Sequence, residues 1–362
     1  MKIAIFHDYI GTIGGGEKLV LTLARELNAD VITTDINKDS IIKMEFDDIN
    51  IISLGETIKL PPLKQISASI KFALCDFTGK YDYFIFSGNW APFAAKRHKP
   101  NLLYCHTPVR AFYDTYNLML QRQSLLAKPF FIVWVAFHKY ISEHYMDHVE
   151  EIVANSRNTQ SRIKNYLKRD AKIIYPPIDT KKYNFKELGD FWLSVNRLYP
   201  EKRVDLQIET FRLMPDKKLV MVGSFAEGDH SSKYVEKIIQ DLPKNIELRS
   251  EISEEELIDL YSRCKGFITT AIDEDFGMTP VEAMASGKPV IAVKEGGYLE
   301  SMIDRKTGIF IEPNICSIIN AMKIISENGK NYREDCEEQA KKFDKSIFIN
   351  DIKKIIEDKQ KN

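Results

Sequence analysis

Short apolar runs alternate with longer amphipathic stretches along this chain, and the alternation occurs twice. The short runs are rich in β-branched residues, whereas the stretches between them repeat apolar residues at helical spacing. Strands that alternate with helices form a parallel sheet with helices on both faces, because parallel neighbours need a crossover connection. The first series predicts strands at residues 2–6, 31–34, 49–54, 83–87, 102–105 and 152–154, and the second at 192–195, 219–222, 246–249, 266–270, 290–293 and 309–311.

A polar segment separates the two series. Tyr175, Pro176 and Pro177 end one more short strand, and the composition then turns polar through residues 179–190. Paired prolines stop regular structure, so this segment is the predicted linker. With 362 residues the chain is long enough for two cores. We therefore predict an α/β fold with two Rossmann-like, doubly wound parallel-sheet domains over residues 1–180 and 190–340, followed by a helix over 341–362.

Composition argues against several classes of function. The 51 basic and 52 acidic residues nearly cancel, which argues against electrostatic binding of nucleic acid. The five cysteines are scattered and include no Cys-x-x-Cys, which fits a reducing compartment and argues against a disulfide framework or a zinc site. Residues 1–9 predict a buried strand rather than a signal peptide, so we expect a cytoplasmic protein.

The most apolar run of the sequence covers eight residues, 130–137. A membrane-spanning helix needs about 20 apolar residues, so this run is too short to span a bilayer. We interpret it as part of a core helix. Because Lys128 precedes it and His138 and Lys139 follow it, contact with a membrane surface is the alternative.

Polar residues and one glycine lie at or shortly after the ends of several predicted strands. Ligands of open parallel sheets bind beyond the carboxyl ends of the strands. We therefore expect one half-site on each sheet, with the two domains facing each other across a cleft. The residues at these positions are His7, Asp8, Ser87 and His106 in the first series, and Asn196, Arg197, Gly223 and Glu274 in the second.

The segment EDFGMTPVE places Glu274 and Glu282 eight positions apart, after a predicted strand and at the start of a predicted helix. Thr279 as N-cap, Pro280 at the first helical position and Glu282 completing a capping box would make the segment a plain helix start. On this interpretation Glu282 has only a structural role.

The same segment also suits a phosphate. Gly277 and Met278 would present backbone N–H groups at the positive end of the helix, where an anion is favoured. The two carboxylates would then flank the phosphate and accept hydrogen bonds from sugar hydroxyls. The residues of this segment alone leave the structural and the functional interpretations open.

A glycine-rich turn, Gly14-Gly15-Gly16-Glu17, lies between the first predicted strand and the first predicted helix. Glycine lets the backbone approach a ligand closely, and a helix N-terminus favours an anion. A plain flexible turn is the alternative. The G-x-G-x-x-G spacing is absent, which argues against a nicotinamide or flavin site.

Two cations lie five positions apart in NRLYPEKR, between a strand and a helix. The guanidinium of Arg197 can bind two oxygens and the ammonium of Lys202 acts as a point charge, a combination that suits a diphosphate. A solvated basic turn is the alternative. Arg203 could replace either cation in this scheme.

The histidines suggest sugar binding more than metal binding. His106 in CHTPVR could cap the sheet through a satisfied ring nitrogen, or hydrogen-bond a sugar hydroxyl or a phosphate oxygen. His144 and His148 are four positions apart on a predicted helix, but no third ligand accompanies them. We do not expect Asp273-Glu274-Asp275 to act as an Asp-x-Asp metal motif, and we predict no metal site.

Several segments together resemble retaining glycosyltransferases of family 4, which have the two-domain GT-B fold. ITTAIDEDFGMTPVEAMASGKPVIAVKEGGYLE resembles the donor-binding segment of that family, and FWLSVNRLYPEKRVDLQIETF resembles its diphosphate clamp. HDYIGTIGGGEKLVLTLA is similar to its N-terminal glycine loop, and YCHTPVRAFYD to its acceptor-side histidine segment. The combination is most similar to bacterial polysaccharide and O-antigen mannosyltransferases that use GDP-mannose. The GT-B fold also implies that the C-terminal helix packs back on the first domain.

The resemblance implies roles for the residues at matching positions. Glu274 would bind hydroxyls of the transferred sugar, and Glu282 the ribose of the nucleotide. Arg197 and Lys202 would hold the diphosphate and neutralise charge as it leaves. His106 would bind the donor sugar at its 6-hydroxyl, near the reaction centre.

Further contacts follow from the same resemblance. Gly16 stands where alanine is common in the family, a departure that leaves the backbone chemistry unchanged. Acceptor-side candidates are Asp8, Ser87 and Arg110. The further donor-binding candidates are Gly15, Gly16, Gly223, Phe276, Gly277, Met278, Thr279 and Glu300.

These parts imply a retaining hexosyltransferase that needs no metal or other cofactor and moves mannose from GDP-mannose onto a lipid-linked or polysaccharide acceptor. Such an enzyme would serve cell-surface glycan synthesis, such as that of the O-antigen of lipopolysaccharide, in the cytoplasm or peripherally at the inner face of the cell membrane. A GT-B transferase that uses a UDP-sugar, such as a sucrose- or glycogen-type synthase, is one alternative. A catalytically weak sugar-nucleotide-binding subunit of an assembly complex is the other.

Overall fold

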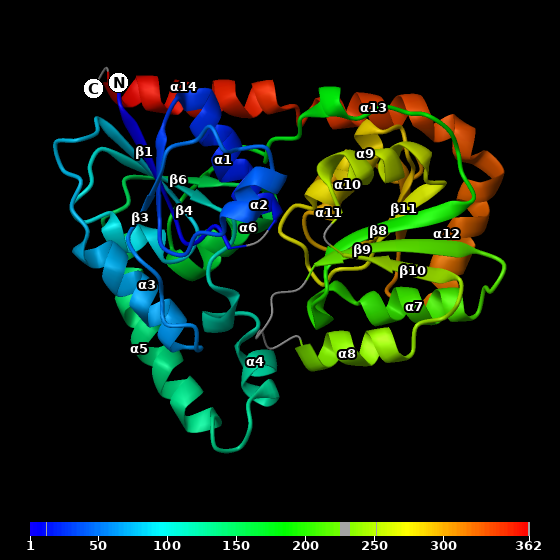
Figure 1. The fold of residues 1–362 in the computed structure, drawn as a ribbon, viewed down its shortest axis with the longest axis horizontal. Coiled ribbons are helices and arrows are strands. Elements are labelled where there is room, and N and C mark those ends of the chain that lie inside the picture. The colour runs from blue at the N-terminus through cyan, green and yellow to red at the C-terminus, as the bar shows by residue number, and fades with distance from the viewer. Residues whose placement is uncertain (12, 225–231, 251, 361–362) are drawn as a thin grey trace. The chain divides into compact units, whose positions relative to one another are not determined.

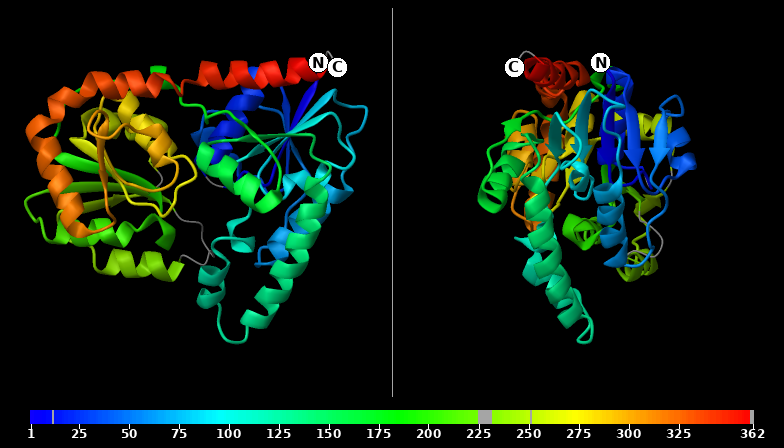
Figure 2. Two further views of the ribbon diagram at one scale, coloured as in Figure 1. Left: turned by 180° about the vertical axis from the view of Figure 1, so that it is seen from behind. Right: turned by 90° about the vertical axis from the view of Figure 1, so that its left-hand side faces the viewer.

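The computed structural model describes residues 1–11, 13–224, 232–250 and 252–360. The chain divides into two compact units (Figures 1 and 2). Unit 1 comprises Met1–Tyr175 and Ile349–Asn362, and unit 2 comprises Pro176–Phe348. The division falls directly after Tyr175, so residues 179–190, the predicted linker, lie within unit 2. The last helix, α14 (Lys345–Gln360), begins in unit 2, and its Lys359 forms an ion pair with Glu151 of unit 1 at 3.4 Å.

Unit 1 contains a parallel sheet of seven strands in the order β3-β2-β1-β4-β5-β6-β7. The strand order reverses between β1 and β4, where His7 lies opposite Ser87 at the carboxyl ends. The strands are β1 (Ile3–His7), β2 (Asp30–Thr33), β3 (Ile51–Ser53), β4 (Tyr83–Ser87), β5 (Asn101–Cys105), β6 (Glu151–Ala154) and β7 (Lys172–Ile173). The α-helices between them are α1 (Gly15–Leu27), α2 (Lys38–Lys43), α3 (Leu63–Leu74), α4 (Tyr116–Arg122), α5 (Lys128–Met146) and α6 (Arg157–Arg162).

Unit 2 contains a parallel sheet of six strands in the order β10-β9-β8-β11-β12-β13. Figure 1 shows α9 and α10 on one face of this sheet and α7 and α8 on the other. The strands are β8 (Phe191–Arg197), β9 (Lys218–Ser224), β10 (Ile246–Arg249), β11 (Gly266–Thr269), β12 (Val290–Val293) and β13 (Gly308–Ile311). The α-helices are α7 (Val204–Arg212), α8 (Ser232–Gln240), α9 (Glu254–Arg263), α10 (Met278–Ala285), α11 (Tyr298–Ser301), α12 (Ile315–Asn328) and α13 (Arg333–Lys341).

The strands lie where the alternating pattern predicts them, and two Rossmann-like parallel-sheet domains are confirmed. Some ends differ from the prediction. β1 includes His7, and β8 continues through Asn196 and Arg197, because both residues pair with β9 in register. Helix α9 begins with a capping box: the Ser253 hydroxyl accepts the N–H of Glu256 at 3.1 Å, and the Glu256 carboxylate accepts the N–H of Ser253.

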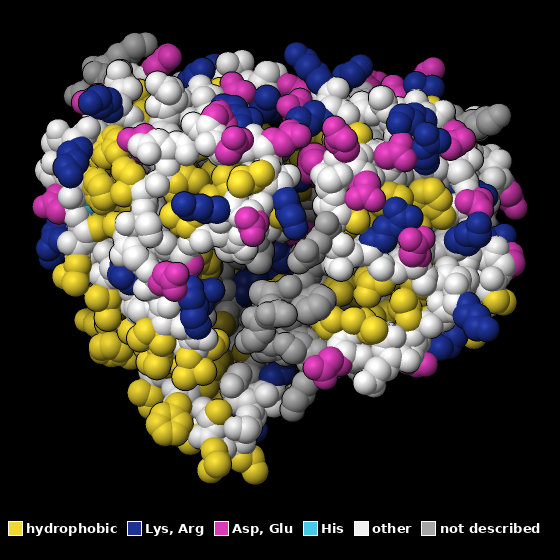
Figure 3. All heavy atoms as spheres, in the orientation of Figure 1, with side chains coloured by type: hydrophobic (Ala, Val, Ile, Leu, Met, Phe, Trp, Pro, Cys, Tyr) yellow, Lys and Arg dark blue, Asp and Glu magenta, His cyan; other side chains and the backbone are white. Residues whose placement is uncertain are grey.

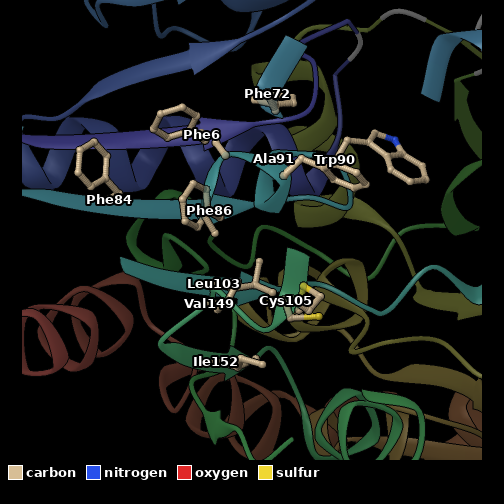
Figure 4. Close-up of a cluster of buried hydrophobic side chains, with 14 of the residues drawn as sticks. Phe6, Phe72, Phe84, Phe86, Trp90, Ala91, Leu103, Cys105, Val149 and Ile152 are labelled. Carbon is tan, nitrogen blue, oxygen red and sulfur yellow. The ribbon is translucent and has the colours of Figure 1, made fainter. Parts of the chain in front are cut away.

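The core of unit 1 is aromatic around the central strands (Figure 4). Phe6, Phe84 and Phe86 are at most 1% exposed, and the Phe6 ring lies 5.4 Å from the Phe86 ring between centroids. Burying each such side chain contributes about 1.5–3 kcal/mol relative to leaving it in water. This packing fixes the two strands whose carboxyl ends bear His7 and Ser87.

Asp8 ties the end of β1 to the turn after β4. Its carboxylate, 7% exposed, accepts the backbone N–H groups of Asn89, Trp90 and Ala91 at 2.7–2.8 Å. Burial raises the pKa of this carboxyl, and the three donors act in the opposite direction. The turn brings Gly88 so close that a Cβ there would lie 2.5 Å from Asp8 Cγ, at a φ of +107°. Asp8 therefore has a structural role in unit 1.

Residues 130–137 form a helix, as predicted, but one face of this helix is exposed. The prediction of a core helix is wrong for that face. The residues lie in α5, where Phe130, Val133 and Phe137 are 67–76% exposed. Trp134 and His138 of the same helix pack inward. The run is apolar all around, so its sequence did not reveal which face would stay uncovered. No helix in the described part of the chain is long and apolar enough to cross a membrane.

We expect Gly88→Ala to destabilise the protein more than Gly79→Ala. Both glycines have positive φ, which costs about 1–2 kcal/mol for alanine, but only at Gly88 would the new methyl displace a buried carboxylate. Overpacking of this kind costs about 1–3 kcal/mol more. Denaturant unfolding followed by circular dichroism measures the difference, and equal losses would contradict the anchoring role of Asp8.

Candidate active site

Three polar side chains meet at the carboxyl edge of the unit 1 sheet. The Ser87 hydroxyl hydrogen-bonds His106 Nε2 at 2.8 Å, and His7 Nδ1 donates to the Ser87 carbonyl at 3.1 Å. These residues end β1 and β4 and follow β5, so three neighbouring strands place them. Together with Gly16 they form what we call the unit 1 cluster.

Gly16 lies beside the His106 ring in the first turn of α1. A Cβ at residue 16 would lie 3.8 Å from His106 Cε1, which is ordinary van der Waals contact, so alanine also fits there. Helix α1 begins at Gly15 with Gly14 as N-cap, and the N–H of Lys18 donates to the Gly14 carbonyl at 2.9 Å. The glycine loop and His106, predicted separately from sequence, are therefore brought together at a helix N-terminus that favours an anion.

His106 is an uncharged hydrogen-bonding group at neutral pH. Burial of the ring, with a smaller effect of nearby His7, lowers the pKa of His106 to about 3. A neutral imidazole bound to Ser87 can donate or accept one further hydrogen bond. The predicted acceptor-side Arg110 lies in the η2 turn (Arg110–Phe112), where Asp114 pairs with its guanidinium at 2.7 Å.

An ion pair marks the carboxyl edge of the unit 2 sheet. Lys202 Nζ lies 2.6 Å from Glu274 Oε2, and both side chains are mostly buried, at 26% and 20% exposed. Lys202 follows β8 and Glu274 follows β11, two strands that are neighbours where the strand order reverses. Ligands of doubly wound sheets bind at this place. Arg197 is the last residue of β8, on the same edge.

A second ion pair, between Arg203 and Glu295, lies close by. Arg203 NH1 donates to Glu295 Oε1 at 2.9 Å, and Glu295 Oε2 accepts the N–H of Asp273 at 3.1 Å. Arg203 itself has a left-handed backbone and precedes α7. The Arg203–Glu295 pair therefore holds the loop that bears Glu274. This structural role distinguishes Arg203 from Lys202, which pairs with Glu274 itself.

Helix α10 starts earlier than the sequence predicts, and the proposed capping box is wrong. The helix begins at Met278 with Gly277 as N-cap at φ +88°, and no side chain caps it. A Cβ at residue 277 would lie 2.6 Å from the Tyr298 ring, so only glycine allows this start. Thr279 and Pro280 lie inside the first turn. Because the N-cap Gly277 has no side chain to accept them, the backbone N–H groups of the first turn could serve an anion.

The loop before α10 is held by a second glycine loop. Gly297 N–H donates to the Glu274 carbonyl at 2.7 Å, and a Cβ at residue 297 would lie 2.3 Å from Phe276 Cα. Phe276 is buried against Phe343. Glu300 lies on the short helix α11 that follows this glycine loop, partly exposed. The backbone around Glu274 is thus fixed from both sides.

Two tyrosines that sequence reasoning missed lie beside Glu282. Tyr261 OH donates to Glu282 Oε2 at 2.8 Å. Burial, and next the charge of the nearby Glu282 carboxylate, raise the pKa of the Tyr183 hydroxyl. The two rings pack edge to face at 5.8 Å. Tyr183 and Tyr261 lie 99 and 21 positions before Glu282, so no local motif links them to it. We call Lys202, Glu274, Gly277, Met278 and Glu282 the unit 2 cluster.

Gly223, predicted to bind the donor, has a packing reason to be glycine. A Cβ there would lie 2.7 Å from Leu198 Cγ, and Leu198 is 1% exposed. Within the described ranges, no group of three or more His, Cys, Asp or Glu side chains is placed to hold a metal ion.

The comparison with protein families concerns unit 2. Residues 177–343 match the family model described as "Glycosyl transferases group 1". This segment is similar to glycosyltransferase group 1 domains. It contains all five residues of the unit 2 cluster.

Similar proteins include α-mannosyltransferases. The chain is 26% identical over 259 residues to mouse "Alpha-1,3/1,6-mannosyltransferase ALG2", covering 63% of this chain and 60% of that protein. It is 27% identical over 369 residues to the Candida glabrata protein of the same name, covering 84% and 78%. The matched part thus spans about three fifths of the mouse relative.

Solved structures share the fold over nearly the whole chain. Anabaena Alr3699/HepE in complex with UDP and glucose superposes with a TM-score of 0.75 at 18% identity, covering 98% of this chain and 99% of that one. Sucrose-phosphate synthase from Thermosynechococcus elongatus gives 0.77 at 15% identity, covering 99% and 98%. The two sheets of this protein therefore have the GT-B glycosyltransferase fold.

We expect His106 to stay neutral down to about pH 4, because the pKa of its ring is lowered to about 3. Below pH 6.5 the unfolded chain binds a proton at this residue before the folded chain does, so its contribution to stability is full above that pH and is lost as the pH falls toward 3. His106→Gln should therefore flatten the loss of stability in this window. NMR titration of the ring measures the pKa directly, and titration near 6.5 would contradict the burial argument.

Proposed function

We propose that the protein is a retaining, metal-independent hexosyltransferase of family 4. It transfers a hexose, with mannose from GDP-mannose as the favoured donor, to a lipid-linked or polysaccharide acceptor of cell-surface glycan synthesis. The observation that supports this most is the Lys202–Glu274 pair, which lies at the switch point of the sheet in the segment that matches the group 1 model. The enzyme would work in the cytoplasm or at the inner face of the cell membrane.

The diphosphate is assigned to the positive groups of the unit 2 cluster. Lys202 and Arg197 supply two cations, and the N-terminus of α10 at Gly277 and Met278 supplies backbone N–H groups. All lie at the same edge of one sheet, where charge on a leaving diphosphate would be stabilised. These groups can neutralise the leaving group without a divalent cation, so we expect activity to survive a chelator.

The sugar and the ribose are assigned to carboxylates. Glu274 would accept hydrogen bonds from sugar hydroxyls, and Glu282, held by Tyr261, from the ribose. The neutral His106 would hydrogen-bond the donor sugar, with Gly15 and Gly16 near the phosphates. Phe276, Thr279 and Glu300 would line the donor site.

The reaction breaks the bond between the anomeric carbon and the diphosphate oxygen. Retention requires the acceptor hydroxyl to attack from the face that the diphosphate leaves. We propose that the new bond forms between the acceptor oxygen and the anomeric carbon, while the hydroxyl proton passes to the departing phosphate oxygen. The side chains then act by binding, orienting and charge stabilisation.

Two observations bear on the donor. Relatives named α-1,3/1,6-mannosyltransferases favour mannose, and the likeness to a protein solved with UDP and glucose favours a UDP-sugar as the alternative. The third candidate is a catalytically weak subunit that binds the sugar nucleotide, because the same residues could bind this donor without transferring its sugar.

The donor is tested by calorimetry with GDP-mannose, GDP, UDP-glucose, UDP-N-acetylglucosamine and UDP, with and without magnesium. We expect GDP compounds to bind, UDP compounds not to bind, and magnesium to have no effect. A UDP preference would overturn the sugar assignment, and a magnesium requirement would overturn the role of the two cations. Absence of binding to all five would contradict the proposed function.

We expect Glu274→Gln to separate binding from transfer. Without its carboxylate partner Lys202 can bind the diphosphate more strongly, so nucleoside diphosphate affinity should hold or rise by up to about tenfold. Sugar transfer should fall by about 10²–10³-fold, as for loss of a transition-state contact. Calorimetry and a transfer assay measure the two effects.

Glu295→Gln is the matched control, because Glu295 pairs with Arg203 at 2.9 Å and is 27% exposed, much like Glu274. It should leave transfer within a few-fold of the wild type. If Glu295→Gln and Glu274→Gln impair transfer equally, the assignment of Lys202 and Glu274 over the neighbouring pair is wrong.

A further inference from the structure

Unit 1 exposes a continuous apolar surface over α3, the α4–α5 turn and α5. Figure 3 shows these side chains gathered at the lower left of the view, down to the tip of the turn. Leu125 and Leu126, in the turn, are 82% and 85% exposed. The nine residues of this apolar face are Leu63, Ile70 and Leu74 of α3, Leu125 and Leu126 of the turn, and Phe130, Val133, Phe137 and Tyr140 of α5.

The exposed residues of α5 lie on one side of a helix that is firmly packed on the other. Phe130, Val133, Phe137 and Tyr140 recur at intervals of three and four, which places them on one helical face. On the opposite face His138 uses both ring nitrogens. Its Nδ1 accepts Trp134 Nε1–H at 2.9 Å, and its Nε2 hydrogen-bonds the Ser69 hydroxyl of α3 at 3.0 Å. The apolar face is therefore a fixed surface that spans two helices.

Basic residues outnumber acidic residues around the apolar face. Residues 57–75 and 115–142, which contain α3, α4 and most of α5, include no aspartate or glutamate. The chain as a whole has 52 acidic and 51 basic residues, so this segregation is a local feature. Two of the lysines have acidic partners outside these segments: Lys59 pairs with Asp35 and Glu56, and Lys139 pairs with Glu143. The cations of the two segments are Lys59, Lys64, Lys71, Arg122, Lys128 and Lys139.

We propose that the apolar face binds a membrane surface that contains anionic lipids, with the α4–α5 turn inserted among the head groups. Protruding leucines and phenylalanines enter the acyl boundary, and flanking Lys and Arg attract acidic head groups. A second copy of the chain fits less well, because a symmetric contact through this face would bring like charges together. The inference concerns unit 1 alone and does not depend on the donor or on the reaction.

Vesicle flotation tests the proposal with the full chain. Vesicles of phosphatidylcholine alone are compared with vesicles that contain about 30% phosphatidylglycerol, at low and high salt. We expect binding to the anionic vesicles that weakens as salt screens the charges. Equal binding to both kinds of vesicle would overturn the role of the cations, and no binding to either would overturn the proposal.

Three variants separate the contributions. Leu125→Ser, Leu126→Ser and Phe130→Ser combined should weaken binding by more than about 100-fold, because the inserted apolar area is lost. Arg122→Gln with Lys128→Gln should weaken binding to anionic vesicles by about 30-fold, since each cation near the surface strengthens it by about fivefold. Leu213→Ser with Ile239→Ser is the matched control, because these unit 2 residues are also exposed, at 65% and 52%.

Folding and self-association of the variants are measured alongside vesicle binding. Thermal unfolding checks that each variant folds, since all substituted side chains are on the surface. Sedimentation velocity checks self-association: a dimer that the triple variant abolishes, without any vesicle binding by the wild type, would assign the face to a second copy and contradict the proposal.

Discussion

The Lys202–Glu274 ion pair is the interaction on which the proposed chemistry depends. Both side chains are mostly buried, so their desolvation offsets much of the attraction and the pair contributes little to net stability. An ion pair of this kind suits a binding site, because groups of a ligand can take the place of each partner. A diphosphate can take the ammonium of Lys202 while sugar hydroxyls take the carboxylate of Glu274. The same two side chains would then serve the empty and the occupied site.

The fold brings these groups together through strand order. In each sheet the order reverses between two neighbouring strands, β1 and β4 in unit 1 and β8 and β11 in unit 2. Side chains that are distant in sequence therefore meet at one carboxyl edge, as Ser87 and His106 do, and as Lys202 and Glu274 do. Around them the backbone is fixed by close packing, with Gly88 against Asp8 and Gly277 against Tyr298. Rigid loops of this kind pre-organise charge stabilisation.

The strands could be predicted from sequence because buried parallel strands are short, apolar and rich in β-branched residues. Once the strands are predicted, the residues at their ends are known as well. The pattern alone therefore indicates His106, Ser87 and Glu274. The start of α10 could not, because Thr279 and Pro280 give a valid capping signal that the positive φ of Gly277 overrides.

The sequence also did not predict the distant partners of Glu282 or the exposed face of α5. Tyr261 holds Glu282 by a hydrogen bond across 21 positions, and Tyr183 packs against the Tyr261 ring from still farther away in sequence. No periodicity encodes such contacts. Likewise, the apolar run that contains Phe130 and Phe137 fits a buried helix and an uncovered one equally well. Only the packing of Trp134 and His138 shows which side faces the core.

The most direct test of the proposed site is a crystal structure of the protein with a bound nucleoside diphosphate. We predict the distal phosphate within hydrogen-bond distance of Lys202 Nζ and of the backbone N–H groups of Gly277 and Met278, with Glu274 released from Lys202 and turned toward the sugar position. A diphosphate bound elsewhere, with the Lys202–Glu274 pair intact, would contradict the proposed role of this pair.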